Sequence, residues 1–346
     1  MTAPRPPRVQ GVEFELISLL IEAAGASPEI VRSSGGRILV PPGDDAGVIR
    51  LAPEMSLVVS TDLSVEDVHF RRAWSTWEVF GYRAVATALS DLAAMGAQPI
   101  GALVSVALPP ELSSEVVVSL GHGLGECLRA HGACLVGGDL SRSPGPAVLD
   151  VTVLGGVEVP VTRAGARPGD ELWVTGQLGA AAEAVFELRS GLEPAPEVRR
   201  ALERPVPRVA EARWLAARLD IHAMIDVSDG LAGDARHLAT ASGVRVTVRL
   251  AALPLAPCLD GYAGREVALR LGLAGGEDYE LLFAAAPGAV EAWHRAFEAE
   301  FELPLTQIGD VTAGHGMRWV SEDGSDAEIG LAGYDHFAPP VGKNPE

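Results

Sequence analysis

Lysine is almost absent from this chain. The single lysine, Lys343, lies in the C-terminal tail of a sequence of 346 residues. A glycine-rich loop of the GxxxxGK[ST] type is therefore excluded, and so is a core lysine for Schiff-base chemistry. If the protein handles phosphates, arginine side chains, backbone amides or metal ions must supply the positive charge.

Acidic side chains outnumber basic ones, 46 to 27, and cysteines and long apolar runs are scarce. The formal net charge of −19 argues against nucleic acid and anionic membrane surfaces as partners. No apolar run reaches membrane-spanning length, and the N-terminus has no signal-peptide core. Cys127, Cys134 and Cys258 are odd in number and form no CxxC pair. We therefore expect reduced structural thiols in a cytoplasmic protein.

The length and the segment pattern predict two domains. Strand-like and helix-like segments mix in both halves, which indicates an α/β or α+β fold with two lobes. The segment PVTRAGARPGD, residues 160–170, is rich in proline, glycine and charge. We expect it to join an N-terminal domain, residues 1–159, to a C-terminal domain, residues 160–346.

Several local patterns predict where helices begin and end. Ser75 and Glu78 fit a capping box before a helix that reaches residue 96. Gly132 is the expected stop of a second helix, over residues 113–132. A long helical stretch, residues 196–219, is interrupted by Pro205 and Pro207.

Seven aspartates occur within or at the end of segments otherwise fit for burial, and we expect them at turn junctions. They are Asp44, Asp45, Asp62, Asp91, Asp139, Asp226 and Asp229. Two carboxylates about 4 Å apart repel by roughly 4 kcal/mol at an effective dielectric constant near 20. A converging cluster thus needs protons or cations, and Mg²⁺ accepts carboxylates, water and substrate phosphates together. No histidine or cysteine cluster has zinc-site spacing.

The alternative for each aspartate alone is a structural one. Aspartate before a turn commonly caps a helix or tolerates unusual backbone angles. We expect Asp234, at the start of a short helix, to be such a cap or a surface residue. The repeated [ST]D or GD step after an apolar run favours the metal site.

Eight motifs in order carry a resemblance that covers nearly the whole chain. They are EFELI (13–17), GDDAGV (43–48), STD…VHF (60–70), ALSDLAAMGA (88–97), GGDLSRSP (137–144), DVSDGLAGD (226–234), GGEDYELLF (275–283) and GYDHF (333–337). Together they resemble the thiamine-monophosphate kinase family, of the aminoimidazole ribonucleotide synthetase-like superfamily. The resemblance implies a two-lobed fold whose N-terminal lobe contributes strands to a β-barrel across a homodimer.

The implied reaction transfers the γ-phosphoryl group of ATP to thiamine monophosphate, with several Mg²⁺ ions. The implied metal ligands are Asp44, Asp45, Ser60, Thr61, Asp62, Asp91, Asp139, Asp226 and Asp229, with the direct ligand among the first two left open. The implied ATP contacts are Gly138, Asp139, Arg163 and Ser228. The implied substrate contacts are His69, Glu277 and Tyr334. No catalytic residue beyond the metal ligands is implied.

The chain departs from the family pattern at a few positions. Asp67 stands where glycine is usual, Ala88 where asparagine is usual, and Leu140 and Ser141 where two threonines are frequent. None removes an implied metal ligand, but Asp67 bears on the setting of His69.

Three alternatives to the kinase function remain. The first is another ATP-dependent synthetase of the superfamily. The second is a non-catalytic sensor of ATP or thiamine phosphate. The third, a cation buffer, is disfavoured because the aspartates lack EF-hand spacing.

Overall fold

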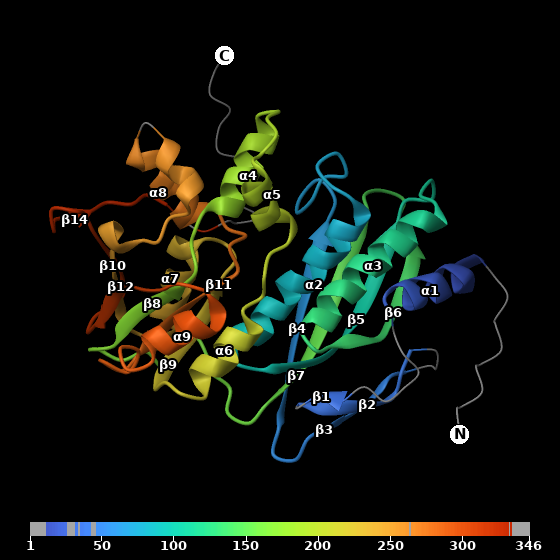
Figure 1. The fold of residues 1–346 in the computed structure, drawn as a ribbon, viewed down its shortest axis with the longest axis horizontal. Helices are drawn as coiled ribbons and strands as arrows, with labels where there is room; N and C mark the ends of the chain where they lie inside the picture. The colour runs from blue at the N-terminus through green and yellow to red at the C-terminus, as the bar shows by residue number, and fades with distance from the viewer. Residues whose placement is uncertain are drawn as a thin grey trace.

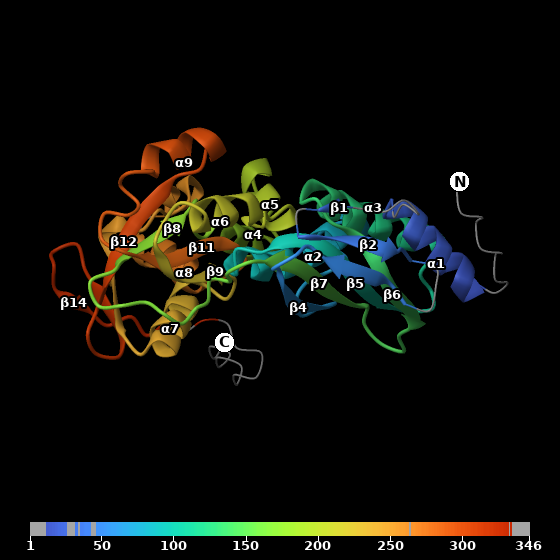
Figure 2. The same ribbon diagram turned by 90° about the horizontal axis from the view of Figure 1, so that it is seen from below.

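The computed structural model describes residues 12–25, 32–33, 35–42, 46–262, 264–331 and 333. They form two lobes that lie side by side (Figures 1 and 2). The first lobe contains α1 (Val12–Ala23), β1 (Arg32–Ser33), β2 (Gly36–Val40), β3 (Val48–Leu51), β4 (Ser56–Val65), α2 (Trp77–Ala94), β5 (Gln98–Leu108), α3 (Ser114–Ala130), β6 (Cys134–Arg142) and β7 (Val148–Val157). The expected mixed α/β architecture with two lobes is confirmed.

The second lobe follows after residue 170. It contains β8 (Glu171–Thr175), α4 (Ala180–Arg189), α5 (Pro196–Glu203), α6 (Val209–Ala216), β9 (Ile221–Val227), α7 (Leu231–Ser242), β10 (Arg245–Arg249), α8 (Arg265–Ala274), β11 (Glu280–Ala285), α9 (His294–Phe301), β12 (Leu305–Thr312), β13 (Gly316–Val320) and β14 (Asp326–Ala327). Two short 3₁₀ turns, Leu250–Ala252 and Pro257–Gly261, lie between β10 and α8. No helix in the described parts of the chain is long and apolar enough to cross a bilayer.

A four-stranded sheet forms the centre of the first lobe, in the order β4–β7–β5–β6. Strand β7 is antiparallel to β4 and β5, whereas β5 and β6 are parallel. Side chains alternate between the two faces of a strand, so Val151 and Val153 of β7 point to one face and are fully buried. Helices α2 and α3 cover that face (Figure 1), with Leu89 and Leu124 in the same apolar cluster.

Strands β1–β3 cover part of the opposite face of this sheet, where Ile38 of β2 is buried with Ile100 of β5 and Val136 of β6. The part of that face along β4 has no covering layer among the described residues. Leu57, Val59 and Leu63 alternate along β4 and are 50%, 54% and 50% exposed. Leu103 of the neighbouring β5 is also exposed. Such a contiguous row of large apolar side chains is unusual for a face that meets only water.

A seven-stranded sheet forms the centre of the second lobe, in the order β14–β13–β10–β12–β8–β11–β9. Strand β11 lies between β8 and β9 and is buried at every position. Leu282 packs on the side of α7, where Leu238 lies in the same cluster. Phe283 packs on the other side with Leu215 of α6 and Phe297 of α9. A strand covered on both faces explains the unbroken apolar run of this segment.

Most local predictions hold, and one shifts by a residue. Helix α3 ends before Gly132, which adopts φ +69°, and the stretch 196–219 splits into α5 and α6 around its two prolines. The predicted cap of α2 at Ser75 is wrong. Thr76 is the N-cap, and its hydroxyl accepts the Val79 amide. Ser75 instead donates to Glu203 of α5, 2.6 Å away. Of the two adjacent hydroxyl residues, the one without this tertiary contact is the N-cap.

Helix α2 belongs to the first lobe but also packs on the second. It contacts α6 and β9, and Ala93 near its end is fully buried in the cluster of the second lobe. Residues on this side of α2 therefore face the junction of the two lobes, which is where the candidate site lies.

Candidate functional site

A cleft of about 530 Å³ lies between the two lobes. Asp62 of β4 and Arg83, Thr87 and Asp91 of α2 line it from the first lobe. Asp226 of β9, the turn that follows it and the loop after α8 line it from the second lobe. The outer wall is partly apolar and comes from α4, α5 and α8, with the residues Ala182, Val185, Phe186, Leu202, Leu271 and Ala274.

Four of the predicted aspartates line this cleft, namely Asp62, Asp91, Asp226 and Asp229, and the first three come from three different elements. Ser60 of β4 donates to Asp91 of α2 at 2.5 Å. The preceding residue of α2, Ser90, donates to Asp226 of β9 at 2.7 Å. Ser90 and Asp91 are consecutive in α2, and they place the carboxylate of Asp91 beside that of Asp226 from the other lobe. Asp91 and Asp226 are 135 positions apart in sequence.

Burial raises the pKa values of Asp62, Asp91 and Asp226, and neighbouring carboxylates add to the rise for Asp62 and Asp226. Burial is the largest cause for Asp62, whose pKa rises to about 6, with Asp91 and Glu277 adding to it. Burial likewise raises the pKa of Asp91, against a hydrogen bond from Ser60. The pKa of Asp226 rises to about 7, through burial first and the charge of Asp91 second. The cleft therefore gathers carboxyl groups whose ionised forms are disfavoured unless a cation lies nearby.

The chemistry of these donors suits a hard cation. No three metal-binding side chains of histidine, cysteine, aspartate or glutamate surround a single point within the described ranges. Mg²⁺ does not need such a cage, because it usually binds through one or two carboxylates and completes its shell with water and phosphate oxygens. The buried carboxylates with raised pKa values fit that pattern.

The aspartates do not all lie where we predicted. Asp62 and Asp139 lie inside strands β4 and β6, and Asp91 inside helix α2, so the expectation of turn junctions is wrong for these three. Asp226 is the penultimate residue of β9, and Asp229 lies in the turn before α7. Side chains within regular elements reach the cleft because the elements themselves converge on it.

Three predicted residues lie away from the cleft carboxylates. Thr61 follows Ser60 on β4, and alternation turns its side chain to the uncovered face of the sheet, where it donates to Asp150 at 2.7 Å. Gly138 and Asp139 lie on β6, at the opposite edge of the sheet from β4, and both are exposed. The structure of one chain does not bring these three together with Asp62, Asp91 and Asp226.

Two predicted nucleotide contacts lie nearer to the carboxylates. Ser228 lines the cleft beside Asp229. Arg163 is exposed, yet its charge lowers the pKa of both Asp91 and Asp226. A cation in this position offsets part of the carboxylate charge.

His69 lines the cleft, and Asp67 takes the backbone shape that glycine would favour. The φ of Asp67 is +65°, in the left-handed region where glycine is free and aspartate is tolerated. The His69 Nδ1 accepts the Val65 amide at 3.0 Å, which places the proton of the neutral ring on Nε2. The departure at Asp67 therefore leaves the histidine in the cleft.

The loop over residues 275–279 carries the predicted Glu277. Its carboxylate lines the cleft and accepts from Arg83 of α2 at 2.8 Å. The next residue, Asp278, points away and accepts the Gly179 amide at 2.8 Å, before α4. Burial raises the pKa of Asp278 well above its ordinary value.

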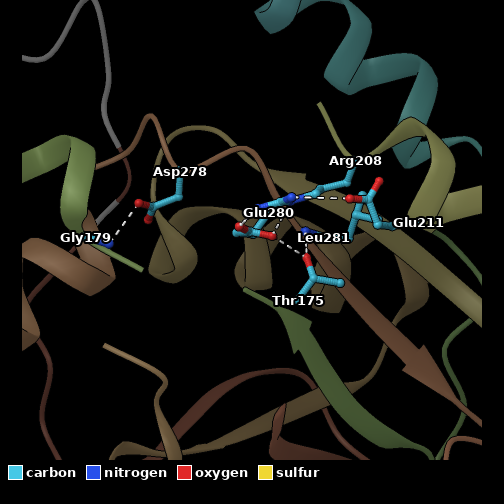
Figure 3. Close-up of polar contacts among 7 residues, drawn as sticks. All are labelled: Thr175, Gly179, Arg208, Glu211, Asp278, Glu280 and Leu281. Carbon is cyan, nitrogen blue, oxygen red and sulfur yellow. Dashed lines mark hydrogen bonds and ion pairs between the residues drawn. The ribbon is translucent and has the colours of Figure 1, made fainter. Parts of the chain in front are cut away.

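The neighbouring Glu280 is held by a buried network that Figure 3 shows. Arg208 donates to both Glu280 oxygens, from Nη2 at 2.5 Å and from Nε at 2.8 Å. Thr175 donates to the same carboxylate at 2.6 Å and accepts the Leu281 amide at 2.8 Å. The end of the loop is thus attached firmly to strands β8 and β11.

Sequence reasoning missed several residues around the site. Asp234 is 3% exposed and accepts the amides of Ser228 and Asp229. The expectation of a cap or a surface residue is wrong, because Gly230 is the N-cap of α7 and the buried Asp234 side chain shapes the turn before it. Burial raises its pKa to about 8. Arg83 was also overlooked. The signal was its spacing from Thr87 and Asp91, which places all three on one stripe of an otherwise apolar helix.

Asp44, Asp45 and Tyr334 lie outside the described residues. Their predicted roles stay predictions.

Known proteins with a similar sequence or fold point to one family. Residues 43–157 match the N-terminal domain of AIR synthase related proteins, and residues 167–320 match the C-terminal domain. The thiamine-monophosphate kinase of Escherichia coli K12 is 34% identical over 335 residues, which cover 95% of this chain and 99% of that protein.

Solved structures agree. The thiamine-monophosphate kinase of Stenotrophomonas maltophilia K279a superposes with a TM-score of 0.78 at 34% identity, over 91% of this chain and 98% of that one. The structure of AaThiL complexed with AMPPCP and TMP superposes with a TM-score of 0.72 at 29% identity, over 96% and 100%. The chain belongs to the thiamine-monophosphate kinase family.

Proposed function

We propose that this protein transfers the γ-phosphoryl group of ATP to thiamine monophosphate and so forms thiamine diphosphate. The observation that carries the proposal is the convergence of Asp62, Asp91 and Asp226, from both lobes, at one cleft. The AaThiL structure with AMPPCP, an ATP analogue, and TMP supports it. The same family membership supports ATP as the second substrate.

We propose that Mg²⁺ is held by the carboxylates and neighbouring groups predicted from the sequence. These are Asp44, Asp45, Ser60, Thr61, Asp62, Asp91, Asp139, Asp226 and Asp229. The support is the gathering of Asp62, Asp91 and Asp226 at one cleft, where burial raises their pKa values and a bound cation would favour the ionised forms. When bound, Mg²⁺ would neutralise the phosphate oxygens of donor and acceptor.

We propose that Gly138, Asp139, Arg163 and Ser228 contact ATP, and that His69, Glu277 and Tyr334 contact thiamine monophosphate. The apolar wall of the cleft, with Val185, Phe186 and Leu202, offers a surface for an aromatic ring. The carboxylate of Glu277 on the other side suits the cationic thiazolium.

The reaction requires the protein to position its substrates and does not require a residue that abstracts a proton. A phosphate monoester has its second pKa near 6, so the acceptor oxygen is already anionic at neutral pH. The residues of the cleft must hold two anions in line and compensate their repulsion. A chain with one lysine can meet that demand with arginines and bound cations.

We further propose that two copies pair through the uncovered face of the first sheet. Leu57, Val59, Leu63 and Leu103 would then be removed from water. The paired strands would form the barrel implied by the resemblance. Thr61 lies on the same face, so pairing would also change its surroundings.

Two further predictions stay proposals. The division of the chain after residue 159 is supported by the positions of β7 and β8, which end and begin at Val157 and Glu171. A cytoplasmic location is supported by the thiols of Cys127, Cys134 and Cys258, which are free.

The test is a product assay on the purified protein. Incubation with Mg-ATP and thiamine monophosphate is expected to give thiamine diphosphate and ADP in equal amounts, resolved by chromatography. Formation of ADP without thiamine diphosphate would point to another enzyme of the superfamily. Binding of ATP without any turnover would favour the sensor.

A further inference from the structure

Arg83 is a buried cation at the boundary of the two lobes, and no role has been assigned to it so far. It extends from α2 into the cleft and is only 12% exposed. Its Nη2 donates to the Glu277 carboxylate at 2.8 Å. The two residues are 194 positions apart in sequence. This ion pair therefore attaches the loop of the second lobe directly to the helix of the first.

The backbone of the loop is held in a conformation that needs external support. Glu277 has φ +67° and Tyr279 has φ +51°, and non-glycine residues enter this region at a cost in free energy. The Glu277 amide donates to the Ser228 carbonyl, and the Tyr279 amide donates to the Val227 carbonyl, both at 2.8 Å. These bonds fix the backbone but leave the side chain of Glu277 to be oriented by other groups.

Two donors orient that side chain, and both reach the same oxygen. Arg83 Nη2 and the Tyr279 hydroxyl donate to Glu277 Oε2, at 2.8 Å and 3.2 Å. Tyr279 is neutral, so Arg83 is the group that compensates the charge. The charges of Asp62 and Glu277 act on one another. Without the guanidinium, repulsion would drive the Glu277 carboxylate out of the cleft toward water.

A second donor of the guanidinium is still available. Within the described ranges, no group accepts a hydrogen bond from Arg83 Nε, although the atom is buried. Arg83 and Glu277 also line a small chamber of about 40 Å³ beside the cleft, together with Asp62 and His69. Such a volume holds a water molecule or a single polar group. A planar guanidinium can donate from Nη2 to Glu277 and from Nε to a group in this chamber at the same time, which the single ammonium group of a lysine cannot do.

We propose that Arg83 is the positioning residue of the substrate site: it fixes the Glu277 carboxylate in the cleft and thereby sets the affinity for the cationic part of thiamine monophosphate. The inference rests on the proposed function. Arg83 acts through Glu277 and not on the transferred phosphoryl group, so its loss affects substrate binding more than the rate at saturation.

The test compares steady-state kinetics of the wild type, Arg83→Met, Arg83→Lys, Glu277→Gln and the Arg83→Met/Glu277→Gln double variant. Arg83→Met is expected to raise KM for thiamine monophosphate roughly 10- to 100-fold, as for the loss of a charged hydrogen bond. The KM for ATP and kcat are expected to change less than about threefold. Arg83→Lys should fall between the wild type and Arg83→Met, because charge is kept and the planar fork is lost.

The double variant distinguishes positioning from independent effects. If Arg83 acts through Glu277, the double variant has the same KM for thiamine monophosphate as Glu277→Gln alone. The proposal would be overturned if the effects of the two single substitutions on KM multiplied in the double variant. It would also be overturned if Arg83→Met lowered kcat more than it raised KM. Should Arg83→Met fail to fold, Arg83→Lys combined with Glu277→Gln answers the same question.

Arg208→Met is the matched control for loss of a buried ion pair. Arg208 is 17% exposed and pairs with Glu280 rather than Glu277, and it does not line the cleft. It is expected to lower the unfolding temperature without a selective rise in KM for thiamine monophosphate. An equal rise in KM in this control would reduce the role of Arg83 to general stability. A wild type that makes no thiamine diphosphate would instead overturn the proposed function itself.

Discussion

Replacing Asp226 with asparagine should stabilise the metal-free protein at pH 8, even though it damages the site. Asp226 is 7% exposed, and its pKa is raised to about 7 by burial and by the charge of Asp91. Asparagine has nearly the same shape, and its oxygen can still accept the Ser90 hydroxyl, which lies 2.7 Å from the carboxylate in the wild type. The substitution thus removes a buried charge while leaving the packing intact.

The sign follows from the direction of the pKa change. Between pH 3.8, the ordinary value, and about pH 7, the unfolded carboxyl group is ionised while the folded one still holds its proton. The free energy of unfolding therefore falls as pH rises through this window, and the loss is complete above it. The full difference corresponds to about 4 kcal/mol at pH 8, and relaxation around the charge reduces the expectation to roughly 2–4 kcal/mol.

Thermal unfolding in EDTA measures this effect. At about 2.1 cal/mol/K per residue, the entropy of unfolding of this chain converts 2–4 kcal/mol into a rise of roughly 3–6 °C. The advantage of Asp226→Asn should be present at pH 8 and vanish near pH 4. Added Mg²⁺ should stabilise the wild type more than the variant.

Asp310→Asn is the control, because Asp310 is a 44% exposed carboxylate outside the cleft. It should leave the unfolding temperature nearly unchanged at both pH values. An Asp226→Asn protein no more stable than the wild type at pH 8 in EDTA would refute the reasoning.

Three further predictions concern the metal site, the network behind it and the uncovered sheet. Asp91→Asn should reduce turnover at least 100-fold, as expected for loss of a charge-stabilising ligand, with a native circular dichroism spectrum; a near-normal rate would remove its role in holding metal. Arg208→Met leaves Glu280 buried without its cation and should lower the free energy of unfolding in urea by about 3 kcal/mol; unchanged stability would contradict the network's contribution. Leu57→Asp combined with Val59→Asp should convert a dimer into monomers in light scattering, and an unchanged mass would exclude this face as the interface.

The fold was largely predictable because its signals are local. The periodicity of α2 and α3, the stop at Gly132 and the break at Pro205 and Pro207 depend on backbone geometry within a few residues. The cap of α2 was misplaced because Ser75 and Thr76 are equally suitable hydroxyl residues. Ser75 donates to Glu203, which is 128 positions away in the sequence, and local sequence does not reveal that contact.

The site was predictable in part. Asp62, Asp91, Asp226 and Glu277 were identified from their motifs, and all four line the cleft. The prediction of a cap or a surface position for Asp234 failed because a single sequence does not reveal burial.

The kind of chemistry follows from the sequence: many aspartates, one lysine and eight ordered motifs specify an acidic protein that handles phosphates with imported cations. Which side chains lie close together depends on the folded chain. Ser60 and Thr61 are neighbours in sequence, yet alternation along β4 sends one to Asp91 and the other to the opposite face. The pairing of Arg83 with Glu277 and the raised pKa of Asp226 likewise depend on groups from the other lobe. Electrostatic interactions depend on distance and burial in space, and neither is encoded by separation along the chain.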